Sequence, residues 1–123
     1  MAGKKVIFIA FAIEDERQRD FLKGQSLNTY SPFEYIDMSV KEAYSSEWKE
    51  KVRTRIIRSD GVMALVSKNS LTSSGQKWEI ACAREEKKRV LGIWAYKDDR
   101  TDLQGVNTVV WTWDAIKAFI DNL

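Results

Sequence analysis

Short runs of apolar residues alternate along the chain with charged stretches that have helical periodicity. Continuous apolar runs are typical of strands that are buried on both faces of a parallel sheet. On this pattern we predict strands at 6–11, 33–36, 61–66, 89–94 and 108–111. We predict helices at 13–24, at 47–58, from Ser73 to about Lys88, and after Thr112, with a polar loop at 67–75.

Several residues mark where these helices begin and end. Gly24 is predicted to stop the first helix, because glycine is a common helix terminator. Ser73 followed three residues later by Gln76 matches a capping box. Thr112 is a candidate N-cap for the last helix, whose apolar stripe is formed by Ile116, Phe119, Ile120 and Leu123.

Strands that alternate with helices imply βαβ units, a parallel sheet and helices on both of its faces. We therefore expect a single α/β domain over residues 1–123, a flavodoxin-like three-layer sandwich with a five-stranded parallel sheet in the order 2-1-3-4-5. Ligands of such sheets bind beyond the carboxyl ends of the strands, where the strand order reverses. The functional surface should be formed by the residues after Phe11, those around Asp37, and the loop that begins at Ser67.

The composition excludes several kinds of chemistry. The chain of 123 residues has no histidine and one cysteine, Cys82, which rules out a Ser-His-Asp triad, a Cys-His dyad, an internal disulfide and a histidine or cysteine-rich metal site. Its net charge of +2 gives no basic field that would indicate a nucleic-acid partner. Any catalysis must therefore use carboxyl, amine, phenol or hydroxyl groups, and we expect no metal.

The sequence indicates a cytoplasmic protein with no membrane partner. The apolar run from Val6 to Ile13 is far shorter than the roughly 20 residues of a spanning helix. Three acidic residues at 14–16 follow it at once, which argues against a signal peptide. The lack of a cysteine pair also suits a reducing compartment.

Two common users of this fold type do not fit. A flavin phosphate would need small or hydroxyl-bearing residues after the first strand, where this chain has Glu14 and Asp15. A phosphoacceptor receiver domain would need an aspartate at the end of the third strand, where this chain has Ser67.

Three motifs in order resemble those of one superfamily. The first is Phe8-Ile9-Ala10-Phe11-Ala12 followed by Asp15. The second is a helix with Trp48 and Ile56, followed by Ser59-Asp60 and an apolar strand that ends in Ser67. The third is Ser73-Ser74, followed by Trp78-Glu79-Ile80 and Ala83. Over nearly its whole length the chain resembles the TIR (Toll/interleukin-1 receptor) superfamily, in particular the bacterial TIR-like branch that includes the sensor proteins of Thoeris antiphage defence.

This resemblance implies an enzymatic activity. Enzymatic TIR domains cleave the nicotinamide–ribose bond of NAD+ with one glutamate, whose position corresponds to Glu79. The bacterial defence members release ADP-ribose or a cyclised isomer, so a downstream effector would sense the product. The resemblance also implies self-association through the domain. NAD+ would be the substrate, and no further cofactor is expected. This chemistry needs a carboxylate beside an oxocarbenium-like ribose but no histidine.

Further residues are candidates for substrate binding, each with a structural alternative. Phe11 and Ala12 follow the first strand, and the phenylalanine could instead belong to the core. Ser67 could bind ribose, orient Glu79 or cap a turn, and Asp37 could hold a ribose hydroxyl or form an Asx turn. Trp78, like Trp48, could stack on a base or pack in the core, and Tyr44 could act as a stacking lid. Trp94, Trp111 and Trp113 are assigned to the core or a partner surface, and Cys82 to the core.

Two other functions remain open. Ala10 and Ala12 replace the hydroxyl residues that are usual after the first strand of this superfamily, and the segment after Asp37 is not glycine-rich. Both differences suit a non-catalytic TIR-like interaction module. A nucleoside deoxyribosyltransferase-like enzyme, which shares this fold type and uses a glutamate nucleophile on N-glycosides, is the third hypothesis.

Overall fold

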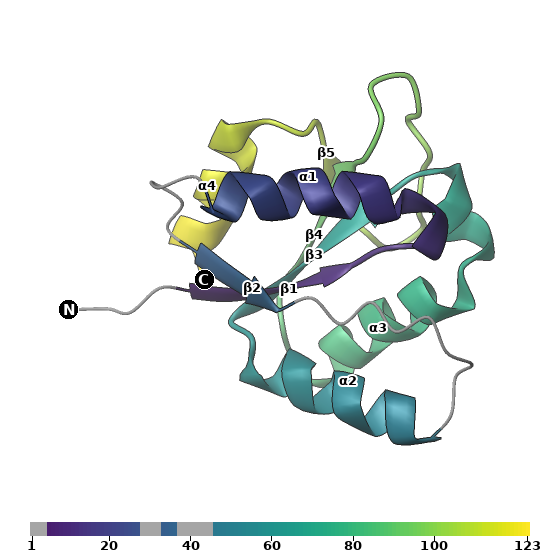
Figure 1. Ribbon diagram of the computed structural model, residues 1–123, viewed down its shortest axis with the longest axis vertical. Helices are drawn as coiled ribbons and strands as arrows, with labels where there is room; N and C mark the ends of the chain where they lie inside the picture. The colour runs from purple at the N-terminus through teal and green to yellow at the C-terminus, as the bar shows by residue number, and fades with distance from the viewer. Residues whose placement is uncertain (1–4, 28–32, 37–45) are drawn as a thin grey trace.

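The fold was derived from a computed structural model, which describes residues 5–27, 33–36 and 46–123 (Figure 1). The strands are β1 (Lys5–Ala10), β2 (Phe33–Ile36), β3 (Gly61–Val66), β4 (Val90–Trp94) and β5 (Thr108–Val109). The helices are α1 (Glu16–Leu27), α2 (Ser46–Arg58), α3 (Ser74–Glu85) and α4 (Trp113–Asp121), with 3₁₀ helices at Ile13–Asp15 and Lys68–Thr72. No helix within these ranges is long and apolar enough to span a membrane.

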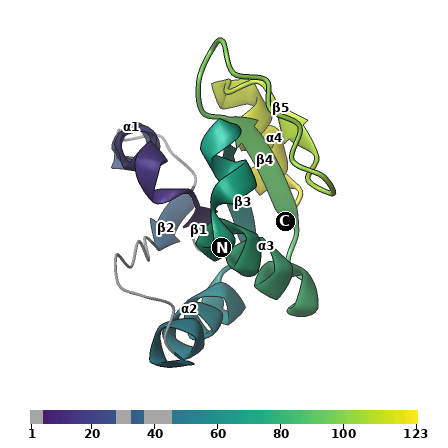
Figure 2. The same cartoon turned by 90° about the vertical axis from the view of Figure 1, so that its right-hand side faces the viewer.

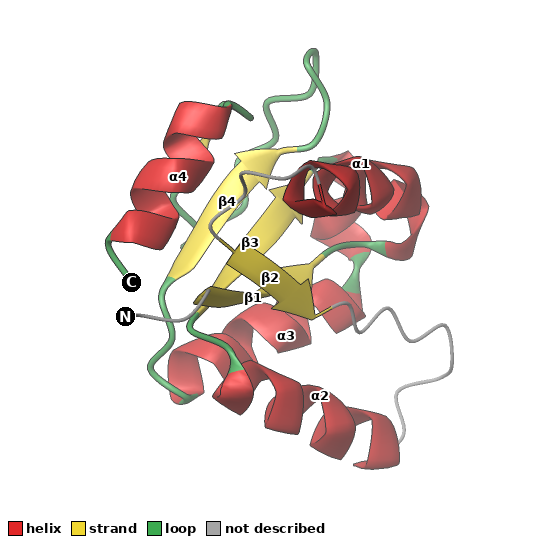
Figure 3. Ribbon diagram, turned by 60° about the vertical axis from the view of Figure 1, so that its left-hand side comes forward, coloured by secondary structure: helices red, strands yellow, loops and turns green. Residues whose placement is uncertain are grey.

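The strands form one sheet in the order β2-β1-β3-β4-β5, and every neighbouring pair is parallel. Helices α1 and α4 cover one face of the sheet, and α2 and α3 cover the other (Figure 3). The predicted α/β class with a parallel sheet is thereby confirmed. The strand order reverses between β1 and β3, so the carboxyl ends of these two strands define the edge where a ligand site is expected.

Each central strand supplies side chains to both faces of the sheet, because successive residues of a strand point in opposite directions. In β1, Phe8 and Ala10 pack toward α2 and α3, whereas Ile7 and Ile9 pack toward α1 and α4. Strand β3 alternates in the same way and is buried along its whole length. This double burial explains why the strands are apolar without interruption.

The structure corrects three local predictions. Gly24 does not end the first helix, which starts after a 3₁₀ turn and continues to Leu27. A glycine in the interior of a helix lowers the stability of the helix by only about 1 kcal/mol relative to alanine, so a helix can continue through it. The segment predicted as a loop from Ser67 contains the 3₁₀ helix, and the helix predicted to reach Lys88 ends at Glu85.

Both predicted serine and threonine N-caps are present, but the capping box is not complete. The Ser73 hydroxyl accepts a hydrogen bond from the Gln76 backbone N–H (3.1 Å), and Thr112 accepts one from Ala115 N–H (3.1 Å). The Gln76 side chain, which would complete a box by returning to Ser73, points instead into the sheet. The predicted final strand is also shorter, because only Thr108–Val109 pair with β4.

Candidate functional site

A buried polar cluster joins the segments that follow β1, β3 and β4. Asp15, in the 3₁₀ turn after β1, is fully buried. Its carboxyl group accepts hydrogen bonds from the Ser67 hydroxyl (2.6 Å), the Asn69 side-chain amide (2.9 Å) and the Tyr96 hydroxyl (2.7 Å). A buried carboxyl group is tolerated when donors surround it. Asp15 therefore fixes three segments of the ligand-binding edge relative to one another.

Ser67, a predicted site residue, uses its hydroxyl group and its backbone N–H in local hydrogen bonds. It is completely buried, and its hydroxyl both donates to Asp15 and accepts from the Asn69 backbone N–H (3.0 Å). Its own backbone N–H donates to the Ser70 hydroxyl (3.1 Å). The serine thus caps the 3₁₀ helix after β3, as in the turn-capping alternative considered for it.

Gln76 connects α3 to the carboxyl ends of β1 and β3. Its side-chain amide donates to the carbonyl oxygens of Ala10 (3.1 Å) and Leu65 (2.7 Å). The side chain is 1% exposed, and its Oε1 atom has no hydrogen-bond partner among the described residues. Backbone carbonyls at the ends of central strands need donors, and Gln76 supplies them. These two hydrogen bonds also fix the position of α3 relative to the sheet.

Glu79 lies one helical turn after Gln76, on the sheet-facing side of α3. The residue is 6% exposed, and its carboxyl group makes no hydrogen bond to any described residue. Burial raises the pKa of this carboxyl group well above its usual range. A buried carboxyl group without a structural partner is unusual, and groups of this kind concentrate in functional sites. In a helix the side chain also leans toward the N-terminus of α3, which lies at the carboxyl edge of the sheet.

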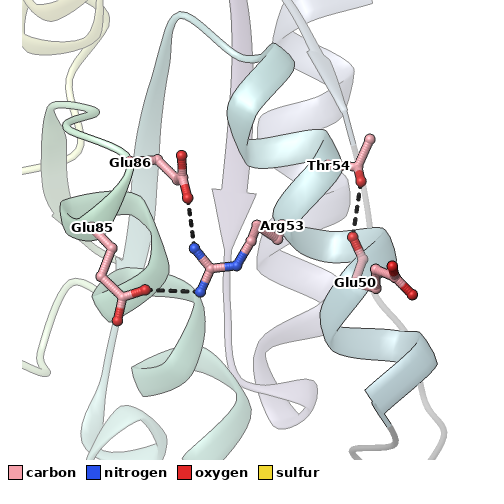
Figure 4. A network of polar contacts seen from close by, with 5 residues as sticks. All are labelled: Glu50, Arg53, Thr54, Glu85 and Glu86. Atoms are coloured by element: carbon pink, nitrogen blue, oxygen red, sulfur yellow. Dashed lines mark hydrogen bonds and ion pairs between the residues drawn. The ribbon is translucent and has the colours of Figure 1, made fainter.

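Trp78 lies beside Glu79 in sequence but packs between helices. Its ring is 5.4 Å from the Trp48 ring, centroid to centroid, with the planes tilted by 53°. The Arg53 guanidinium lies 5.7 Å from the Trp78 ring centroid. The same guanidinium donates to Glu85 (2.8 Å) and Glu86 (2.6 Å) (Figure 4). These contacts hold α2 against α3 and so fix the helix that carries Glu79.

Phe11, the residue after β1, lies in the core on the other side of the sheet. Phe11 is 8% exposed, packs with the side chains beneath α1 and α4, and has the Arg19 guanidinium 5.0 Å from its ring centroid. Ala12 is fully buried and precedes the 3₁₀ turn. Glu79, in contrast, belongs to the helix layer on the opposite face. The structure therefore does not bring Phe11 together with Glu79, and Asp37 and Tyr44 lie outside the described residues.

Four residues of this region have roles that the sequence pattern does not predict: Asp15, Asn69, Gln76 and Tyr96. Asp15 and Asn69 follow two strands that the pattern already placed side by side, so their proximity was accessible in principle. The spacing of Gln76 from Ser73 predicts a capping box and not a contact with the strand ends. Nothing in the sequence marks Tyr96, since its partner lies 81 residues away.

Comparisons with known proteins agree with this fold. A family model described as "Thoeris protein ThsB, TIR-like domain" matches residues 8–100, from β1 to the segment after β4. The solved TIR domain of the Toll-related receptor TRR-2 from Hydra magnipapillata has a similar fold, with a TM-score of 0.67 and 11% identity over 94% of this chain and 91% of that one. No curated protein sequence matches the chain. Because the family model covers most of its length, the chain belongs to the TIR-like domain family of the Thoeris protein ThsB.

Proposed function

We propose that this protein cleaves the nicotinamide–ribose bond of NAD+, with Glu79 as the catalytic carboxylate. The products would be nicotinamide and an ADP-ribose-type signal, either linear or cyclised, that a downstream effector senses in antiphage defence. NAD+ is then the substrate, and the reaction needs no metal or further cofactor. Like other TIR domains, the protein would self-associate, and we expect it to act in the cytoplasm.

The observation that carries this proposal is the state of Glu79. Its carboxyl group is almost completely buried, no described residue donates to it, and it follows the turn of α3 that is fixed to the strand ends by Gln76. A glutamate that served only solubility would be exposed on a helix surface. Such a desolvated carboxyl group is instead suited to stabilise a positive charge that develops in the bound substrate.

The chemistry matches this arrangement. When the C1′–N bond breaks, both bonding electrons leave with nicotinamide, which departs neutral and so needs no general acid. The ribose becomes an oxocarbenium-like cation, which an adjacent carboxylate stabilises. Water, or a hydroxyl or ring nitrogen of the same ADP-ribose unit, then attacks C1′ and loses a proton if it carries one. The absence of histidine is therefore no obstacle.

The raised pKa of Glu79 has a consequence for binding. In the free protein, burial favours the protonated carboxyl group, whereas the reaction needs the carboxylate. The positive charge on the nicotinamide ring of NAD+ favours ionisation of a nearby acid. Substrate binding would therefore shift the Glu79 carboxyl group toward its ionised form.

Alanine at the end of β1 is compatible with the proposal. Ala10, the last residue of β1, and Ala12 are both fully buried. The Ala10 backbone carbonyl accepts a hydrogen bond from the Gln76 amide, so the polar contact of this position with α3 does not depend on its side chain.

The direct test is nicotinamide release by the purified protein, assembled at high concentration, for the wild type and Glu79→Gln. The control is Glu50→Gln, the same chemical change at an exposed position of α2. We expect at least a hundredfold loss for Glu79→Gln, a loss typical of removing one transition-state-stabilising group, and no change for Glu50→Gln. Equal rates for the two variants would overturn the assignment of Glu79. An absence of NAD+ binding in any assembly would favour the interaction module.

A further inference from the structure

A hollow opens at the carboxyl edge of the sheet, and Glu79 is not among the described residues that line it. It has a volume of about 700 Å³ and lies between α1, the segment after β4 and the segment after β5. None of the described residues that line it belongs to α2 or α3, the layer that carries Glu79. Pockets for small molecules commonly have 300–1,000 Å³ in rough terms. The hollow is therefore large enough for a ligand of mononucleotide size.

The walls of the hollow are aromatic and partly uncovered. Tyr96 and Trp111 pack against the core beneath α1 and α4 and also line the hollow. Phe21 of α1 is 60% exposed and Val110 is 49% exposed, and both belong to the same lining. Exposed large apolar side chains that gather at one concave place mark binding sites more often than isolated ones do.

Two positively charged side chains line this hollow. Lys97 and Arg100 line it, and neither forms an ion pair with a described residue. The Arg100 guanidinium lies 4.9 Å from the Trp94 ring centroid, which holds a planar donor group in place without neutralising it. The acidic lining residue Asp20 is already paired with Arg19 (2.8 Å). The uncompensated charge of the lining is therefore positive.

The segment that carries these groups is fixed rather than loose. It extends beyond the end of the sheet in Figure 2. The Tyr96 hydroxyl is bonded to Asp15 (2.7 Å), the Trp94 indole N–H donates to the Thr101 carbonyl (2.9 Å), and Asp99 accepts from the Lys68 backbone N–H (2.8 Å). A pre-formed pocket binds without the cost of ordering its walls.

We propose that this hollow is a second ligand site, which binds a planar aromatic anion of mononucleotide size. The aromatic walls contact the base, and Lys97 and Arg100 receive the phosphate. Arginine suits phosphate because its guanidinium offers paired donors. The site is distinct from the one around Glu79, and the inference does not depend on NAD+ cleavage.

Gly24 offers a sharp test because it lines the hollow from α1, and a Cβ atom built on it meets nothing within 4 Å. Gly24→Leu should fill the hollow without straining the fold, and Gly24→Ala is the matched control. A second, independent variant is Lys97→Gln combined with Arg100→Gln. Binding of AMP, adenosine and ribose 5-phosphate is measured by titration calorimetry, after circular dichroism has shown that each variant is folded.

The expected result is that the wild type binds AMP more tightly than adenosine or ribose 5-phosphate. Gly24→Leu and the double charge variant should each weaken AMP binding about tenfold or more, a loss of about 1.4 kcal/mol, whereas Gly24→Ala and Glu79→Gln should not. The proposal is overturned if AMP does not bind at millimolar concentration, or if it binds Gly24→Leu as well as the wild type. It is also overturned if Glu79→Gln abolishes AMP binding, because the nucleotide would then occupy the other site.

Discussion

The Ser67 hydroxyl donates a 2.6 Å hydrogen bond to the Asp15 carboxyl group, from 52 residues further along the chain, and both side chains are fully buried. This bond joins the carboxyl ends of β1 and β3, where the strand order reverses. Asn69 and Tyr96 bond to the same carboxyl group and bring in the rest of the edge. The candidate site therefore rests on one buried aspartate that does not itself need to touch a ligand.

Asp15→Ala should lower the free energy of unfolding by about 2–4 kcal/mol, because it leaves three donors without their acceptor. Urea denaturation of the purified domain measures this loss. The control is Asp102→Ala, the same truncation at an exposed position, which should change stability by no more than about 0.5 kcal/mol. Similar losses for the two variants would show that Asp15 has no such role.

Gln76→Leu should cost roughly 1–2 kcal/mol, since the Ala10 carbonyl loses its side-chain donor in a buried setting. Gln104→Leu makes the same change at an exposed residue and should be nearly neutral. Thermal unfolding of both variants measures the difference. A Gln76→Leu protein as stable as the wild type would mean that burial of the apolar side chain offsets the lost bonds.

The Tyr96 phenol should lose its proton at a higher pH than an ordinary tyrosine does. Burial and the hydrogen bond to Asp15 raise the pKa of Tyr96 to about 12, from an ordinary value of 10.0. The folded protein therefore holds the phenol proton more tightly than the unfolded chain does. The resulting stabilisation is complete below pH 10 and is lost as the pH rises toward 12. Alkaline absorbance titration should show a late component that Tyr96→Phe removes; an unchanged titration curve would argue against the bond to Asp15.

Glu79→Gln should gain stability relative to the wild type as the pH rises from acidic to neutral values. The pKa of the Glu79 carboxyl group is raised in the folded state, so its stabilising effect is present below the unfolded value of about 4.5 and is lost as the pH rises through the folded value. The advantage of the glutamine variant should therefore grow from acidic to neutral pH. A stability difference that does not change with pH would show that Glu79 is not buried as described.

The layered fold was predictable because its signal is repeated. Each of the apolar runs at Val6, Gly61 and Val90 is long enough to be buried on both faces of a sheet, and these runs alternate with charged stretches that have helical periodicity. The ends of the helices and the directions of side chains near them were less predictable. Gly24 lies inside α1, although glycine is a common helix terminator. The Gln76 side chain turns inward and donates to the carbonyl oxygens at two strand ends.

The site was only partly predictable, because burial and side-chain direction depend on tertiary packing. Glu79 was found through its place in a motif, and its burial is a tertiary property that no spacing contains. Phe11 and Trp78 are aromatic side chains near the right strand ends, but packing directs one into the core beneath α1 and the other toward Trp48. Side-chain direction at the end of an element depends on what packs beside it, which sequence alone does not specify.

The most direct measurement of the central claim is mass spectrometry of nucleotides from phage-infected bacteria that express the wild type, Glu79→Gln or Glu50→Gln at equal levels. The account predicts that NAD+ falls and that nicotinamide and an ADP-ribose-type product accumulate with the wild type and Glu50→Gln, but not with Glu79→Gln. Unchanged nucleotides in all three strains, or the same product with Glu79→Gln as with the wild type, would contradict it.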